Sequence, residues 1–101
     1  MQLLIQAVGT EGNAERLCAL YSSIKMLKHS DDDLGGFLDG SKVPVVVVKG
    51  EGGQTIIVCC DIVEYVECES TFDRGQWLSV PRNVVLELLP DAKKFLKPFT
   101  R

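Results

Sequence analysis

The sequence has few of the residues on which catalysis and metal binding usually depend. It contains a single histidine among 101 residues, and it has no G-x-S-x-G, Walker, G-x-G-x-x-G or Cys-x-x-Cys motif. His29 lies close to the run Asp31 to Asp33, but one imidazole and an acidic loop lack the fixed spacing of a metal site. Acyl transfer, phosphoryl transfer and metal-assisted hydrolysis therefore lack their usual side chains. We expect a non-catalytic protein with no cofactor and no metal.

Long hydrophobic runs are also missing. The longest, VPVVVV, is far shorter than the roughly 20 residues needed to span a bilayer, and the start MQLLIQAVG has no basic segment before its apolar stretch. We therefore expect a cytoplasmic protein without a membrane segment. With 46% hydrophobic and 25% charged residues, the chain is typical of one globular domain spanning residues 1–101.

The four cysteines do not form the pattern of a disulfide-stabilised protein. They are Cys18, Cys59, Cys60 and Cys68, so two are adjacent and one lies in a predicted helix. Neighbouring side chains on a strand point to opposite faces, so a bond between Cys59 and Cys60 would require strained geometry. We expect all four to be reduced thiols that pack as small hydrophobic groups.

Hydrophobic periodicity predicts mixed secondary structure. Residues 2–8 suit a short strand, and residues 13–29 suit one long amphipathic helix. Asn13 is its expected cap, and its apolar positions are Ala14, Leu17, Leu20, Tyr21, Ile24 and Leu27. A helical turn fits residues 34–38, and VPVVVV, apolar on both faces, suits a central strand.

The remaining chain suits a hairpin followed by C-terminal helical turns. KGEGGQ is expected to reverse the chain into a strand TIIVCC, and WLSV is expected to be another strand. Pro81 can begin a helix and Pro90 can end it.

Residues 61–68 are ambiguous. Asp61 and Glu64 suit a helix N-terminus, whereas the β-branched residues of DIVEYVEC and their alternation suit a strand. We favour a strand with a break near Asp61.

These elements predict an α+β fold with a mainly antiparallel sheet. The one long helix can cover only one face of the valine-rich strand. The other face must then be covered by residues 81–99 or by a second subunit, so we also consider a homodimer.

Charge is distributed unevenly. Residues 1–70 carry five Lys and Arg against eleven Asp and Glu, whereas residues 71–101 carry six against three. The segment KKFLKPFTR alternates cations with aromatic rings, as nucleic-acid-binding and membrane-surface segments do. We favour an arrangement in which the rings dock on the core, because Ala92, Phe95, Leu96 and Phe99 form one apolar stripe.

We expect a small interaction module for a protein partner of unknown identity, and a weak nucleic-acid binder is an alternative. The candidate interaction surface consists of Met26, Lys93, Lys94, Phe95, Lys97 and Phe99.

A further alternative comes from KVPVVVV, GGQTIIVCC and DIVEYV. In this order they resemble part of the N-terminal, thioredoxin-like domain of the glutathione transferases and of related domains fused to aminoacyl-tRNA synthetases. The resemblance implies a helix after Cys60, which stands where the family places serine. Cys59-Cys60 replaces the family's acidic-Ser pair for glutathione, and the strand expected between the first helix and Val43 is not evident. The resemblance therefore implies a ligand-binding domain without the family's chemistry.

Overall fold

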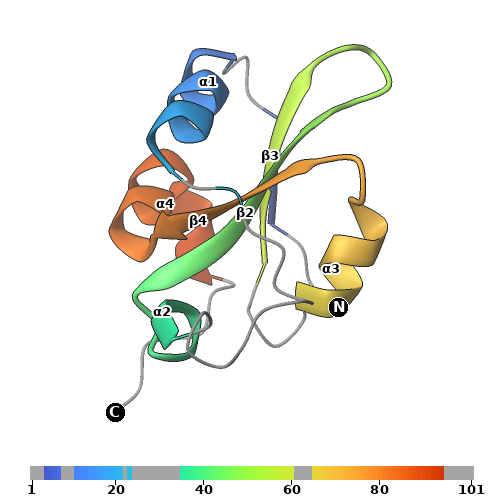
Figure 1. The fold of residues 1–101 in the computed structure, drawn as a ribbon. Coiled ribbons are helices and arrows are strands. Elements are labelled where there is room, and N and C mark those ends of the chain that lie inside the picture. The colour runs from blue at the N-terminus through green and yellow to red at the C-terminus, as the bar shows by residue number, and fades with distance from the viewer. Residues whose placement is uncertain (1–3, 8–10, 22, 24–34, 61–64, 95–101) are drawn as a thin grey trace.

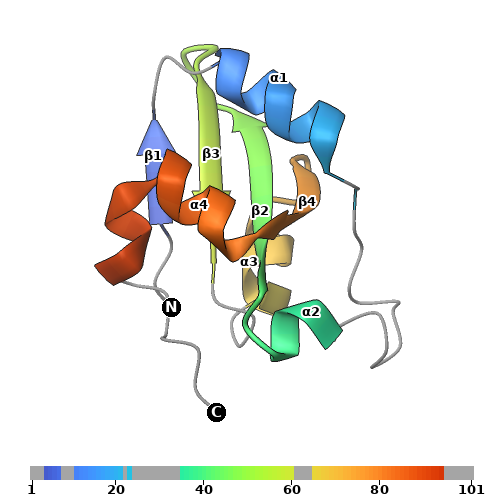
Figure 2. The same ribbon diagram turned by 90° about the vertical axis from the view of Figure 1, so that its left-hand side faces the viewer.

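The computed structural model describes residues 4–7, 11–21, 23, 35–60 and 65–94. The described chain forms a four-stranded antiparallel sheet between two layers of short helices (Figures 1 and 2). In chain order the elements are β1 (Leu4–Ala7), α1 (Glu11–Leu20), α2 (Gly35–Leu38), β2 (Lys42–Lys49), β3 (Thr55–Cys59), α3 (Tyr65–Thr71), β4 (Gln76–Pro81), α4 (Arg82–Leu88) and the 3₁₀ helix η3 (Pro90–Lys94). The α+β class and the antiparallel sheet are thus confirmed.

The sheet has the strand order β1-β3-β2-β4, with β2 and β3 at its centre. They form the expected hairpin, in which Val46 is paired with Val58. Gly53 has a φ of 84° in the connecting turn, a conformation that glycine adopts without steric cost. The prediction of a central strand is confirmed. Strand β2 lies inside the sheet, and consecutive valines that point to opposite faces are buried, as expected for a strand covered on both faces.

Two hydrophobic clusters lie on opposite faces of the sheet. In the first, α1, α4 and η3 pack on the face that includes Val45 and Leu78. In the second, α3 and Phe37 of α2 pack on the face that includes Val46 and Trp77. Figure 2 shows α1 and α4 in front of the sheet and α3 behind it.

This arrangement corrects the expectation for the second face. The C-terminal helices lie on the same face as α1, and the opposite face is covered by α2 and α3 of the same chain. The sheet faces therefore provide no reason for a second subunit.

The strand expected over residues 61–68 is also wrong where the structure describes it, because Tyr65–Thr71 is the helix α3. Tyr65, Cys68 and Phe72 follow one another at spacings of three and four, and all three pack against the second face. The amide of Phe72 donates to the carbonyl of Cys68 at 3.0 Å, which extends the helical bonding by one residue. Residues 61–64, including the expected break at Asp61, lie outside the described residues.

The first helix is shorter than expected. Helix α1 begins at Glu11 and ends at Leu20, and Ser23 already forms a β-bridge with Leu78 of β4. Asn13 therefore lies inside the helix instead of capping it. Ala14 and Leu17 are buried as expected, but Leu20 is 66% exposed. The single helix over residues 13–29 is not confirmed, and residues 24–29 lie outside the described part.

Both prolines act as expected at the C-terminal helices. Pro81 directly precedes α4, and the amide of Leu89 donates to the carbonyl of Val85 at the end of this helix. Pro90 then begins η3. Because proline has no amide hydrogen, it is compatible with a helix start but not with its continuation.

Candidate functional site

The C-terminal end of the described chain carries part of the predicted interaction surface. Leu89 and Ala92 are buried in the first cluster, whereas Lys93 of η3 is exposed. Lys94 also belongs to η3. The start of the basic segment is therefore fixed to the core on one side and presents a cation on the other.

The structure does not describe the other residues of the predicted surface. Met26, Phe95, Lys97 and Phe99 lie outside the described residues, and so do His29 and Asp31 to Asp33. The expectation that Phe95 and Phe99 dock on the core stays a prediction.

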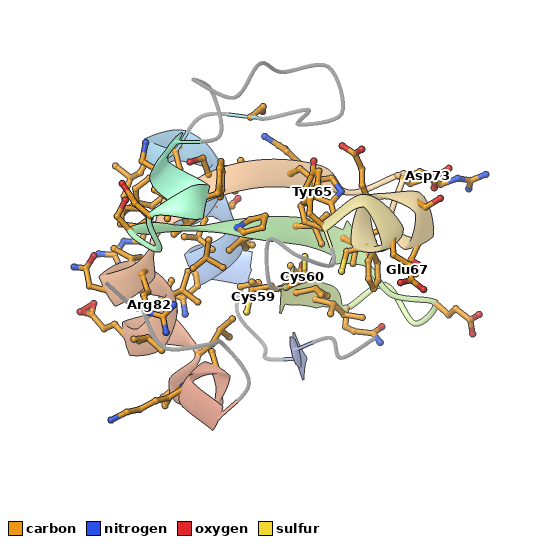
Figure 3. The ribbon with its side chains drawn as sticks, turned by 90° about the horizontal axis from the view of Figure 1, so that it is seen from below. Cys59, Cys60, Tyr65, Glu67, Asp73 and Arg82 are labelled. Carbon is orange, nitrogen blue, oxygen red and sulfur yellow. The ribbon has the colours of Figure 1, made fainter. Side chains whose placement is uncertain are left out.

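Around Tyr65 the structure forms a network of aromatic and polar groups that sequence reasoning missed. The Tyr65 hydroxyl donates to Oε2 of Glu69 at 2.6 Å, and its ring meets that of Trp77 edge to face at 5.0 Å between centroids. Trp77 Nε1 donates to the carbonyl of Phe72 at 3.3 Å. Figure 3 shows Tyr65 on α3, on the opposite side of the sheet from Arg82 of α4. The i to i+4 spacing of Tyr65 and Glu69 could have indicated this pair only if a helix had been predicted there.

Glu69 has one carboxylate oxygen without a partner. Its Oε1 atom is buried and makes no hydrogen bond within the described part of the chain. A buried carboxylate oxygen normally requires a donor. One unsatisfied oxygen by itself defines no ligand site.

The cysteines are packed as small hydrophobic groups. None of the four is in a disulfide within the described structure, and Cys59, Cys60 and Cys68 are buried while Cys18 is half-buried. Burial, together with the neighbouring Cys68, raises the pKa of Cys59 to about 12. Burial also raises the pKa of Cys18. Since the thiolate is the reactive form, neither is set up as a nucleophile.

The position that the resemblance assigns to a ligand is closed in this structure. Cys59 and Cys60 are 0% and 1% exposed, and they belong to opposite core clusters (Figure 3). The helix that the resemblance implied is present as α3. However, the residue in place of the family's serine does not reach the surface, so it cannot contact a ligand without rearrangement of the core.

The first cluster contains a small cavity between α1, α4 and the sheet. Its volume is about 10 Å³, room for at most one water molecule. The lining is entirely apolar and consists of Leu17, Val45, Ile57, Val80, Val85, Leu88 and Leu89. It is a packing gap, too small for a ligand.

Among the described residues, no three His, Cys, Asp or Glu side chains come together so that they could hold a metal ion. None of the described helices is both long enough and apolar enough to cross a membrane.

Comparison with known proteins gives no assignment: no family model, no curated protein and no solved structure matches this chain.

Proposed function

We propose that this chain is a small interaction module that binds a protein partner through its basic C-terminal segment. The observation that carries the proposal is the arrangement of η3 and the residue before it: Leu89 and Ala92 are buried, and Lys93 is exposed. Because this turn is already ordered by its packing on the core, binding through Lys93 costs less conformational entropy than binding through a free tail would.

The charge of the C-terminal segment indicates which kind of partner surface it would bind. Residues 71–101 carry three more basic than acidic residues, although the whole chain has a net charge of −3. A locally basic surface on an acidic protein favours an acidic partner surface and increases the rate of encounter with it.

The test compares two triple variants that change the net charge equally. In the first, Lys93, Lys94 and Lys97 are replaced by Glu. In the second, the exposed cations Arg16, Lys42 and Arg74 are replaced by Glu. Both carry the same added negative charge, so only the place of the change differs.

Each variant is immobilised and used to capture partners from the native source, and the captured proteins are quantified by mass spectrometry. We expect the C-terminal variant to bind its partner at least roughly tenfold more weakly, since several charge contacts are reversed at once. The second variant should capture the partner as the wild-type chain does. Equal capture by both variants would contradict the proposal.

A nucleic-acid binder is distinguished in the same experiment. Nuclease treatment during capture should leave a direct protein partner bound, whereas a complex bridged by nucleic acid should be lost. The basic segment with its interleaved aromatic residues is what supports this second candidate.

The ligand-binding alternative is supported by α3 alone, the helix implied by the resemblance. Titration with glutathione, followed by backbone amide shifts, tests it. Shifts at Cys59 and Cys60 would favour that alternative over an interaction module.

A further inference from the structure

The two edges of the sheet differ in their protection. Strand β4 lies at one edge, where Ser23 forms a bridge with Leu78 and Pro81 ends the strand. Proline and local bridging both limit further strand pairing. Strand β1 lies at the other edge, and within the described residues no strand pairs with its outer side (Figure 2).

Strand β1 also lacks the usual features that prevent edge pairing. Its residues, LIQA, include no lysine, no proline and no acid, and the first charged side chain of the sequence is Glu11. An exposed edge strand presents unpaired amide and carbonyl groups to solvent, and natural proteins usually protect such an edge with charge, proline or a bulge. An unprotected edge is suited to another extended strand.

We infer that the outer edge of β1 pairs in an antiparallel direction with β1 of a second copy. The two four-stranded sheets would then become one continuous sheet, with both β4 strands at its ends. A twofold axis relates the copies, so the contact is closed and does not lead to a filament. The protection of β4 fits such closure because it blocks growth at the outer edges.

An uncharged strand such as β1 can pair with its own copy more readily than a charged strand can. In an antiparallel pair across a twofold axis normal to the sheet, each residue faces either its own copy or a residue two positions away. Like charges placed opposite each other would repel, whereas β1 has none. If Gln6 faces its own copy, the two glutamines are directly opposite each other. If it faces a residue two positions away, they are a diagonal pair. In both cases they lie on the same face of the sheet and within contact range.

This geometry gives a complementary-charge test with Gln6→Lys and Gln6→Glu. The matched control is Gln76→Lys, because Gln76 is an exposed glutamine in the other edge strand, β4. Masses are measured by light scattering on a sizing column over roughly 1 µM to 1 mM, since a short strand pair gives a weak, reversible dimer.

We expect the wild-type chain and Gln76→Lys to approach twice the 11.1 kDa of one chain as concentration rises. Each Gln6 variant alone should dimerise at least tenfold more weakly. An equimolar mixture of the two should recover a dimer, and native mass spectrometry should show that it is the heterodimer.

Hydrogen exchange on the unmodified protein provides a second measurement that does not depend on folding of the variants. Amides of Ile5 to Ala7 should become more protected as the concentration is raised. The inference is overturned if the wild-type chain stays monomeric over the whole concentration range. A wild-type chain that remains a monomer but binds a strand of another protein at β1 overturns it as well. It is also overturned if the Gln6 variants dimerise as the wild type does. The proposed function uses different residues, so either result leaves it standing.

Discussion

Gly75 is the position where one added methyl group should have the largest effect on stability. It directly precedes β4, and its amide donates to the carbonyl of Phe72 at 3.0 Å. A Cβ atom at this position would overlap Cγ2 of Val46 and Cγ1 of Val48, two side chains of the neighbouring strand β2. Carbon atoms pack favourably only at about 3.5–4.0 Å, so Gly75→Ala requires one of the strands to move.

The loss of stability depends on how far the side chains and backbone of β2 can move to relieve the overlap. Val46 is fully buried, and valine side chains have a restricted χ1, so neither side chain can rotate away freely. Strand β2 is paired on both sides, which also limits backbone movement. Overpacking typically costs 1–3 kcal/mol, and we expect Gly75→Ala to lie at the upper end, about 3 kcal/mol.

Thermal and urea unfolding measure this loss. For a domain of this size, about 3 kcal/mol corresponds to a decrease in Tm of roughly 12–24 °C. The matched control is Gly12→Ala in α1, where an added Cβ meets nothing within 4 Å. That variant should be more stable by about 0.5–1 kcal/mol, because alanine is a better helix former than glycine.

A double variant separates steric overlap from other causes. Removal of the Val46 methyl groups in Gly75→Ala/Val46→Ala should make the glycine substitution less costly than it is in the wild-type background. A Gly75→Ala protein as stable as the wild type would refute the placement of residue 75 over β2.

Two further predictions concern the second cluster and the thiols. Tyr65→Phe removes the hydrogen bond to Glu69 and should destabilise the fold by about 1–2 kcal/mol; a double-mutant cycle with Glu69→Ala should give a coupling of at least about 0.5 kcal/mol, and additivity would contradict the pair. Burial of Cys59, together with the neighbouring Cys68, favours the protonated thiol in the folded state and raises its pKa to about 12 from an ordinary 9.0. Its contribution is therefore complete below pH 9 and should decline between pH 9 and 12, by at most about 1.4 kcal/mol per pH unit. Urea unfolding of Cys59→Ala should show a shallower decline than the wild type, and equal slopes would count against burial as the cause.

The local pattern of the sequence was sufficient for elements whose partners are close in the chain. The hairpin of β2 and β3 follows from two apolar runs separated by a glycine-rich turn, and the prolines at 81 and 90 mark the ends of α4 through a missing amide hydrogen. The start of the candidate surface was also predictable, since Ala92 and Lys93 follow a helical pattern that separates core from solvent. These features depend on backbone chemistry and periodicity within a few residues.

Only the tertiary structure decided which helix covers which face of the sheet. The alternation in residues 61–68 favoured a strand, but Tyr65 and Cys68 are buried together because α3 packs against Trp77 of β4, a contact between distant segments that no local pattern contains. Leu20, an expected core position, is exposed because α1 ends at this residue, and Ser23 pairs with Leu78 of β4. Sequence by itself determined where apolar side chains occur and which chemistry is lacking. Packing of distant segments determined which of those side chains are covered, because burial is a property of the assembled layers and not of one segment.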